Sequence, residues 1–415
     1  MAELLRFATC GSVDDGKSTL IGRLLYDSKQ ILADQLQHVE DVSQRRGDGS
    51  LDLALLTDGL RAEREQGITI DVAYRAFATA RRRFIIADCP GHEQYTRNMV
   101  TGSSTADLSI VLIDARNGVV AQSRRHASIA SLLRIPHLVV CVNKMDLVDW
   151  DESAFDAVVA QFAEVAQRLE IPDVTFIAIS ARLGDNVVER SERMPWYDGP
   201  TLLTHLEEVE IASEQSLAPA RFPVQWVIRP QDADHPDYRG YAGRVAGGSL
   251  ARGDDVVILP SGRSSRVAGI DTLDGDLDRA SAPMSVTVLL EDDIDVARGD
   301  MIVTGEELPL VTSQLRARIC WMAQSPLRVG DRYVIKHTTR SVRAVVDGVE
   351  DRLDIETLRP DQSAEELLLN DIGAVSLRLS GPLVVDPYSS NRETGSFILI
   401  DESSNDTVAA GMILG

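Results

Sequence analysis

The stretch Gly11-Ser12-Val13-Asp14-Asp15-Gly16-Lys17-Ser18 fits the pattern G-x-x-x-x-G-K-[ST] and follows an apolar run, 4–10, that predicts a strand. Two glycines allow tight turns, so successive backbone N–H groups and the N-terminus of a helix predicted over 18–26 point at one anion. Lys17 is expected to reach the terminal phosphates of a nucleotide, and the Ser18 hydroxyl to ligate Mg²⁺. The alternative is a glycine-rich turn without a ligand. The succession of strand, loop, Lys-Ser pair and helix favours a phosphate-binding loop.

Length and composition are those of a soluble protein with several domains. The chain has 415 residues, of which 44% are hydrophobic and 26% charged, enough for about two to four domains. Its formal net charge of -22 argues against a broad hold on nucleic acid or on anionic membranes, because each phosphate contact needs a cation. Between Arg316 and Arg343 the balance reverses. A basic face there is one interpretation, and arginines scattered over strands are the favoured one.

The cysteines and the N-terminus favour a cytoplasmic protein. Four cysteines are widely spaced, with no C-x-x-C pair and no zinc spacing, and we expect reduced thiols in the core. The N-terminus enters the first predicted strand without a leader, and no apolar run approaches the ~20 residues needed to span a bilayer.

A candidate switch precedes the second buried strand. The segment 61–71 contains Thr69, and short helices are predicted before it over 33–44 and 52–64. Taken alone, Thr69 is a β-branched residue that begins a strand. Beside a phosphate loop, its hydroxyl is a candidate to complete the Mg²⁺ shell while a γ-phosphate is present, which would make the segment an order-disorder switch.

The run 83–88 predicts a buried strand that ends in Asp88 and is followed by Cys89-Pro90-Gly91-His92. An acid at the carboxyl end of a strand is placed to hold Mg²⁺ through water. Gly91 can bring its N–H to the γ-phosphate, since no side chain blocks the approach. His92 is the candidate to orient the attacking water. A lone histidine is more often a surface or core residue, but the position directly after this glycine favours the catalytic role.

Asn143-Lys144-Met145-Asp146 follows a strand predicted over 138–143. The two acceptors of the Asp146 carboxylate match the adjacent N1–H and N2 amino donors of guanine, a pair that adenine lacks. Asn143 and the stem of Lys144 are expected to brace the base and the phosphate loop. A further strand, 174–179, leads into Ser180-Ala181-Arg182, whose backbone N–H groups are candidates to contact the guanine oxygen.

Alternation of apolar strands and helices predicts the fold class of the first part of the chain. Strands over 83–88, 108–114 and 138–143 alternate with helices over 93–102 and 123–133. This order implies an α/β domain with a mostly parallel sheet covered by helices on both faces. In such sheets the ligand lies at the carboxyl ends of the strands, where the motifs above are found.

From about residue 210 the pattern changes to short strands separated by turns such as Gly247-Gly248, which is typical of small all-β barrels. We therefore expect three domains, an α/β P-loop GTPase domain over 1–210 and β-barrels over 217–308 and 312–415. Asp292, Asp293 and Asp295 fit a metal site or a solvated turn, and the turn is favoured.

In order and spacing, these motifs resemble those of translation-factor-type GTPases such as elongation factor Tu. The resemblance implies that GTP is bound by Gly11, Ser12, Val13, Asp14, Asp15, Gly16, Lys17, Ser18, Thr19, Asp88, Cys89, Pro90, Gly91, His92, Asn143, Lys144, Met145, Asp146, Ser180, Ala181 and Arg182. The implied catalytic residues are His92, Lys17 and Gly91. The implied Mg²⁺ ligands are Ser18, Thr69 and Asp88.

Within this superfamily the chain resembles the GTPase subunit of bacterial sulfate adenylyltransferase, through the runs 11–28, 56–74, 88–99 and 222–230. Ser12 stands where the elongation factors have a histidine. The resemblance implies that GTP hydrolysis is coupled to formation of adenylylsulfate and pyrophosphate from ATP and sulfate. A separate small catalytic subunit would bind ATP and sulfate, in a heterodimer or a larger assembly.

Other functions are weighed against this one. Some relatives carry an adenylylsulfate kinase, but the sequence through Gly415 has no second phosphate loop, so that activity is not expected. A translation factor that carries aminoacyl-tRNA is the alternative, followed by a stand-alone nucleotide switch. The loop residues and the extent of the resemblance favour sulfate activation, with no membrane or nucleic acid as partner.

Overall fold

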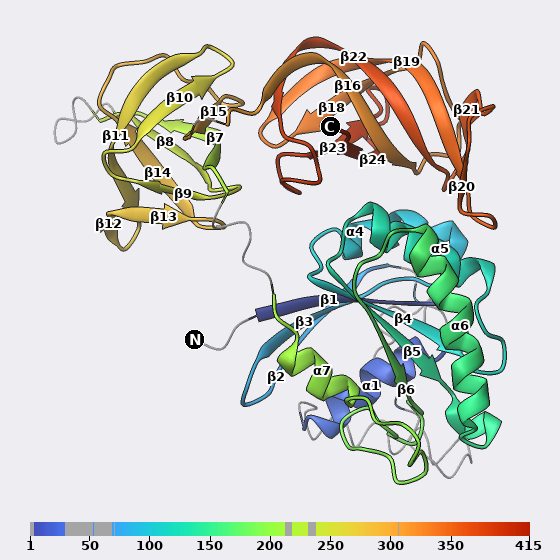
Figure 1. Cartoon of the computed structure of the whole chain (residues 1–415). Coiled ribbons are helices and arrows are strands. Elements are labelled where there is room, and N and C mark those ends of the chain that lie inside the picture. Colours follow the sequence, from blue (N-terminus) through green and yellow to red (C-terminus); the bar gives the residue numbers. More distant parts are fainter. Residues whose placement is uncertain are drawn as a thin grey trace. The chain divides into compact units, whose positions relative to one another are not determined.

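The computed structural model describes residues 4–29, 53, 69, 71–211, 218–230, 238–305 and 307–415. The chain divides into two compact units, Met1–Ile211 with Asp354–Arg359, and Ala212–Leu353 with Pro360–Gly415. The first unit is an α/β layer structure and the second is built from β-strands (Figure 1). The predicted fold class is confirmed.

A six-stranded sheet forms the centre of the first unit, in the order β2-β3-β1-β4-β5-β6. Its strands are β1 (Leu4–Gly11), β2 (Ala73–Ala78), β3 (Arg83–Asp88), β4 (Leu108–Asp114), β5 (His137–Asn143) and β6 (Val174–Ala178). β2 runs antiparallel to β3, and all other neighbours are parallel. Every residue of β4 is buried, as a strand covered on both faces requires.

Helices cover both faces of this sheet, with α1 and α7 on one side and α4 and α5 on the other (Figure 1). The helical elements are α1 (Lys17–Asp27), η2 (Glu93–Tyr95), α4 (Thr96–Ser103), α5 (Ala121–Leu132), η3 (Met145–Val148), α6 (Glu152–Arg168) and α7 (Leu202–Glu208). The helix predicted over 93–102 begins later, because a 3₁₀ turn occupies its first residues. The helices predicted over 33–44 and 52–64 lie outside the described residues, apart from Leu53.

Two β-barrels make up the second unit. Barrel 1 consists of β7 (Arg221–Ile228), β8 (Gly240–Arg244), β9 (Ser249–Ala251), β10 (Asp255–Leu259), β11 (Arg263–Thr272), β12 (Gly275–Leu277), β13 (Arg279–Ser281), β14 (Ser285–Leu290) and β15 (Met301–Val303). Barrel 2 consists of β16 (Leu310–Trp321), β17 (Leu327–Arg328), β18 (Arg332–His337), β19 (Arg340–Asp354), β20 (Arg359–Asp361), β21 (Glu366–Leu367), β22 (Ile372–Val385), β23 (Ser396–Ile400) and β24 (Thr407–Ile413). The pairings β10–β11 and β18–β19 close the two main sheets.

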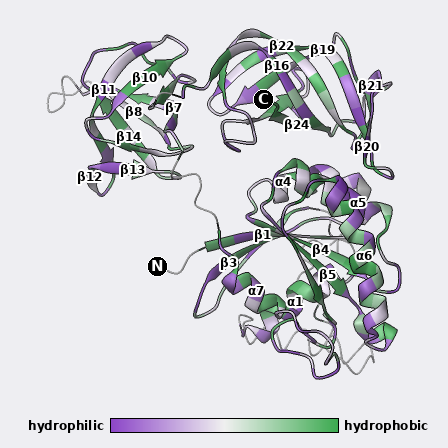
Figure 2. Ribbon diagram, in the orientation of Figure 1, coloured by the Kyte–Doolittle hydropathy of each residue, from purple (hydrophilic) through white to green (hydrophobic). Residues whose placement is uncertain are grey.

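Each barrel has an apolar core of its own, and hydrophobic and hydrophilic residues alternate along its strands (Figure 2). In the first unit, by contrast, β4 and β5 are hydrophobic along most of their length (Figure 2). This difference follows from burial on one face in the barrels and on both faces in the sheet.

A buried ion pair joins the two barrels. The Nε and Nη2 atoms of Arg221 donate to the two carboxylate oxygens of Asp386 at 3.0 and 3.1 Å. Nη2 also donates to the carbonyl oxygen of Glu307 at 3.0 Å, and the Thr394 hydroxyl donates to Asp386 at 2.6 Å. Val384 of barrel 2 packs beside this pair in a small apolar cluster with residues of barrel 1.

Several charged side chains for which the sequence allowed two interpretations form ion pairs or hydrogen bonds with neighbouring residues. In the basic stretch of barrel 2, five arginines contact acids, in the pairs Arg316–Glu350, Arg318–Asp351, Arg328–Glu366, Arg340–Asp300 and Arg343–Glu402. Arg239 pairs with Asp293 and Asp295, and Asp292 accepts a hydrogen bond from Ser265. These contacts favour scattered arginines over a basic face, and a turn over a metal site. Within the described ranges, no helix has both the length and the apolar character needed to span a bilayer.

Candidate GTP-binding site

The predicted phosphate loop connects β1 to α1 at the carboxyl end of the sheet. Gly16 precedes the helix with a φ of 92°, a conformation that favours glycine. A Cβ atom on Gly16 would lie 2.5 Å from Nδ2 of Asn143, so a side chain there would collide with β5. Because glycine offers no capping side chain, the first N–H groups of α1 remain available to an anion.

The interior of the loop is held by its own acid. The backbone N–H of Ser12 donates to Oδ2 of Asp15 at 2.7 Å, and the N–H of Asp15 donates to the carbonyl oxygen of Ser12 at 3.2 Å. Burial raises the pKa of Asp15 to about 6. Asp14 adopts a positive φ of 70° between these two residues. The loop is therefore fixed by hydrogen bonds before any ligand is considered.

Lys17 lies between two of the predicted Mg²⁺ ligands. Its ammonium group forms a buried ion pair with Asp88 at the end of β3 and donates to the Thr69 hydroxyl at 2.5 Å. Residues far apart in the sequence thus converge on one positive charge. Carboxylate and hydroxyl oxygens are ligands that Mg²⁺ accepts, so this donor set fits the predicted cation. Ser18 and Thr19 follow in the first turn of α1, both half-buried.

The segment after β3 lies directly against the phosphate loop. The N–H of Cys89 donates to the carbonyl oxygen of Thr9 at 3.2 Å. A Cβ atom on Gly91 would lie 2.2 Å from the carbonyl oxygen of Gly11, so this close approach requires glycine. Gly91 is therefore placed beside the loop, as the prediction of an N–H near the terminal phosphate needs.

His92 follows Gly91, but its side chain is exposed. Its Nδ1 accepts a hydrogen bond from the N–H of Gln94 at 3.2 Å, and its ring centroid lies 6.0 Å from that of Tyr95. With Nδ1 as an acceptor, the neutral ring carries its proton on Nε2.

Asn143 links the phosphate loop to the predicted base-contacting segment. Its Nδ2 donates to the carbonyl oxygen of Asp15 at 2.7 Å, and its Oδ1 accepts from the N–H of Ala181 at 2.9 Å. The Ser180 hydroxyl donates to Oδ1 of Asp146 at 2.7 Å. The structure thus brings together the loop, the Asn143–Asp146 motif and the Ser180–Arg182 segment. No described residue donates a hydrogen bond to the second carboxylate oxygen of Asp146.

Two side chains that the sequence analysis did not select support this site. Asp114, at the end of β4, contacts the Lys144 ammonium at 3.0 Å and also binds Arg116. Burial opposes its ionisation, but hydrogen bonds from Arg116 and Lys144 prevail and lower the pKa of Asp114 to about 2. Arg23 of α1 donates to the carbonyl oxygens of Ala181 and Arg182. The position of Asp114 at a strand end, like that of Asp88, was the signal that could have found it.

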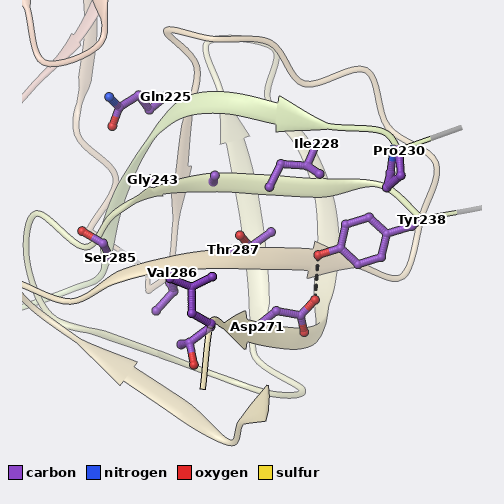
Figure 3. A pocket seen from close by; sticks show the side chains of 12 residues that line it. Gln225, Ile228, Pro230, Tyr238, Gly243, Asp271, Ser285, Val286 and Thr287 are labelled. Atoms are coloured by element: carbon purple, nitrogen blue, oxygen red, sulfur yellow. Dashed lines mark hydrogen bonds between the residues drawn. The ribbon is translucent and has the colours of Figure 1, made fainter. Parts of the chain in front are cut away.

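A separate cavity of ≈ 680 Å³ lies on barrel 1 (Figure 3). Its lining includes Tyr238, whose hydroxyl donates to Asp271 at 2.7 Å. Burial and this hydrogen bond raise the pKa of Tyr238 to about 12. None of the predicted GTP-binding residues lines this cavity.

The sequence matches the family "Elongation factor Tu GTP binding domain" over residues 2–212 and the family "GTP-eEF1A C-terminal domain-like" over residues 314–414. It is 58% identical over 415 residues to the bifunctional enzyme CysN/CysC of Mycobacterium tuberculosis (strain H37Rv), covering 100% of this chain and 68% of that enzyme. It is 51% identical to sulfate adenylyltransferase subunit 1 of Alteromonas mediterranea, covering 99% of this chain and 87% of that protein.

The chain belongs to the sulfate adenylyltransferase subunit 1 family. It is a GTPase subunit of this family, with a GTP-binding domain of the elongation factor Tu type. The predicted resemblance is confirmed. Subunit 1 of Laribacter hongkongensis is 53% identical, covering 99% of this chain and 85% of that protein.

Proposed function

We propose that this subunit hydrolyses GTP to promote formation of adenylylsulfate and pyrophosphate from ATP and sulfate on a separate small catalytic subunit. One observation carries the proposal. At the carboxyl end of the sheet, Lys17, Thr69 and Asp88 converge beside an uncapped helix N-terminus in a chain of this family. The sequence contains one phosphate loop, which we assign to GTP, so ATP and sulfate are placed on the partner.

The phosphate loop binds the β- and γ-phosphates through its backbone N–H groups and the Lys17 ammonium. As the phosphates enter, they replace Asp88 as the partner of Lys17. Ser18, Thr69 and Asp88 are then free to hold Mg²⁺. When bound, Mg²⁺ supplies neutralisation of the negative charge on the phosphate oxygens.

Guanine is selected by the Asp146 carboxylate, which accepts from the N1–H and N2 amino donors. Asn143 and Lys144 position this acid and the loop, and the backbone of Ser180–Arg182 contacts the guanine oxygen. The Ser180 hydroxyl already orients Asp146, so the base site is arranged in advance. Preorganisation of this kind reduces the ordering cost of binding.

Hydrolysis uses the segment after β3. The N–H of Gly91 contacts the γ-phosphate, and His92 orients the attacking water after its side chain turns toward the site. Water then attacks the γ-phosphorus, GDP is the leaving group, and the γ-phosphate is released as inorganic phosphate. Since His92 is exposed and bound to a neighbouring N–H, this rotation is a step at which a partner can control turnover.

We place the protein in the cytoplasm, in a heteromer with the small adenylyltransferase subunit. A net charge of -22 supports a protein partner over nucleic acid. The three predicted domains, 1–210, 217–308 and 312–415, have different roles. The first binds GTP, and the barrels transmit its state to the partner.

The test is affinity purification of the tagged protein from its host grown without reduced sulfur, followed by GTP hydrolysis assays with ATP present. We expect a stoichiometric adenylyltransferase-like chain and turnover stimulated by sulfate. The variant His92→Ala should lower this turnover about a hundredfold and leave GTP affinity nearly intact. Recovery of ribosomes or aminoacyl-tRNA, with turnover indifferent to sulfate, would overturn the proposal in favour of translation.

A further inference from the structure

Two cysteines lie side by side at the carboxyl ends of neighbouring strands. The parallel register pairs Thr9 of β1 with Asp88 of β3, and the N–H of Cys89 continues the ladder by donating to Thr9 at 3.2 Å. Cys10 and Cys89 are therefore the next facing pair, with side chains on the same face of the sheet.

The pair is enclosed by polar groups behind the phosphate loop. Both side chains are fully buried, and the Cys89 sulfur lies 3.8 Å from the Ser103 hydroxyl of α4. Cys141 differs, because its register partners on the neighbouring strands are Leu112 and Ile177, so no thiol faces it among the described residues. Of the described cysteines, Cys10 and Cys89 are thus the two placed to react with each other.

Cys10 and Cys89 lie next to the close contact between Gly11 and Gly91 at the proposed nucleotide site. Cys10 precedes Gly11, and Cys89 lies two residues before Gly91. No room exists for a Cβ atom between Gly91 and the Gly11 carbonyl oxygen. Any movement that draws the two cysteines together therefore changes the contact between the phosphate loop and the segment that carries His92.

We propose that Cys10 and Cys89 form a reversible disulfide whose formation stops GTP hydrolysis. Neighbouring strands lie about 4.8 Å apart, within the Cα separation that disulfides span. The sulfurs must nevertheless approach to about 2.05 Å, which displaces the backbone on both sides of the Gly11–Gly91 contact. The effect on hydrolysis rests on the proposed nucleotide site, whereas formation of the bond does not.

Hydrogen peroxide is the oxidant class that fits a buried pair, since it is little larger than water. A thiolate attacks one peroxide oxygen, the O–O bond breaks, and a sulfenic acid and water form. The second thiol then attacks the sulfenic sulfur, forming the S–S bond and releasing the hydroxyl group as a second water. In total, two thiols are oxidised and one peroxide is reduced to two waters. A dithiol reductant reverses the change.

The test uses the full chain, reduced and then titrated with hydrogen peroxide, with free-thiol counts, peptide mass spectrometry and GTP turnover. We expect loss of two thiols, a linked peptide pair that contains Cys10 and Cys89, at least a tenfold fall in turnover and recovery with dithiothreitol. Absence of the linked pair would overturn the proposal, as would a linked protein with unchanged turnover. If the reduced chain bound no GTP, the proposed function would fail, and the linked peptides would still decide the site.

Matched variants separate this pair from other thiols. Cys10→Ser should keep the turnover of the reduced protein and lose its reversible inhibition by peroxide. Cys320→Ser, which changes a buried cysteine of barrel 2, should remain as sensitive as the unmodified chain. Reversible inhibition that persists in Cys10→Ser, or disappears in Cys320→Ser, would contradict the assignment. Should Cys10→Ser fold poorly, the linked peptides of the unmodified chain decide alone.

Discussion

The nucleotide site of the first unit and the Arg221–Asp386 contact between the two barrels of the second unit, here called the joint, each bury a positively charged side chain against a carboxylate. At the joint, Arg221 binds both oxygens of Asp386, and backbone carbonyls and Thr394 satisfy the remaining groups. At the site, among the described residues, Lys17 contacts one oxygen of Asp88 and the Thr69 hydroxyl.

This difference separates a structural ion pair from an exchangeable one. A planar guanidinium held in two directions cannot change partners without leaving a buried charge unpaired. An ammonium on a flexible stem is a point charge that can turn to another anion. We therefore expect Asp386 to act on stability and Lys17 to act on GTP binding.

The largest effect is expected at Lys17. The variant Lys17→Ala should weaken GTP binding more than about a thousandfold, about 4 kcal/mol, because the charge that meets the terminal phosphates is removed. Titration with a fluorescent GTP analogue measures this loss. Lys336→Ala, which removes a lysine exposed on β18, is the control and should bind like the unmodified chain. Unchanged affinity in Lys17→Ala would end the assignment of the phosphate loop.

At the joint we expect a loss of stability without a loss of GTP binding. Asp386→Ala should destabilise the second unit by about 3 kcal/mol, because Arg221 stays buried without its partner. Urea unfolding followed by tryptophan fluorescence measures this change, and GTP affinity should remain the same. The control is Asp347→Ala, which removes a more exposed partner of Arg378 on barrel 2. Equal effects of the two variants would show that burial does not distinguish these pairs.

The predicted guanine-binding site offers a third case, because hydrogen bonds hold the Asp146 carboxylate in place before the ligand binds. Asp146→Asn should shift nucleotide preference from guanosine to xanthosine by about a hundredfold, because the amide presents a donor where the carboxylate presented an acceptor. Competition between GTP and XTP for the protein measures the shift. Retained guanine preference would mean that Asp146 does not read the base.

The motifs at the carboxyl ends of the strands could be predicted because the residues of each motif are close together in the sequence. Strands such as 83–88 and 108–114 are continuous apolar runs, and the structure has them at those residues. The edge strand β2 was expected only as a strand that begins at Thr69, and it begins at Ala73 instead, because the alternating exposure along Ala73–Ala78 gives a weak signal for its bounds. The roles assigned to His92, Asp146 and the other site residues remain predictions.

Contacts between distant residues could not be predicted in the same way. Arg23 supports the Ser180–Arg182 segment only because α1 packs near it in the fold. The facing of Cys10 and Cys89 depends on the register of β1 and β3, which their spacing in the sequence does not reveal. The joint between Arg221 and Asp386 likewise needs both barrels to be formed.

A smaller effect is expected from Asp15, whose buried carboxylate forms no ion pair among the described residues. Its folded-state pKa, about 6, is raised above the unfolded value, so ionisation disfavours the folded state increasingly as pH rises from about 4 to 6. Asp15→Asn removes this cost. The variant should therefore gain about 1 kcal/mol more stability at pH 7.5 than at pH 5, measured by thermal unfolding at both values. A gain independent of pH would show that Asp15 does not titrate in this range.

The smallest effect is expected for the pair Arg316–Glu350, which has good geometry but whose arginine side chain is mostly exposed. Arg316 places its Nη2 2.6 Å from Glu350, with most of its side chain in water. Water and salt screen such a pair, and the cost of ordering two long side chains offsets its attraction. Arg316→Ala should leave the unfolding midpoint of the second unit unchanged within error, at low and at moderate salt. A clear loss of stability, comparable with that of Asp386→Ala, would mean that bidentate geometry matters more than burial and would remove the basis for separating the two kinds of ion pair.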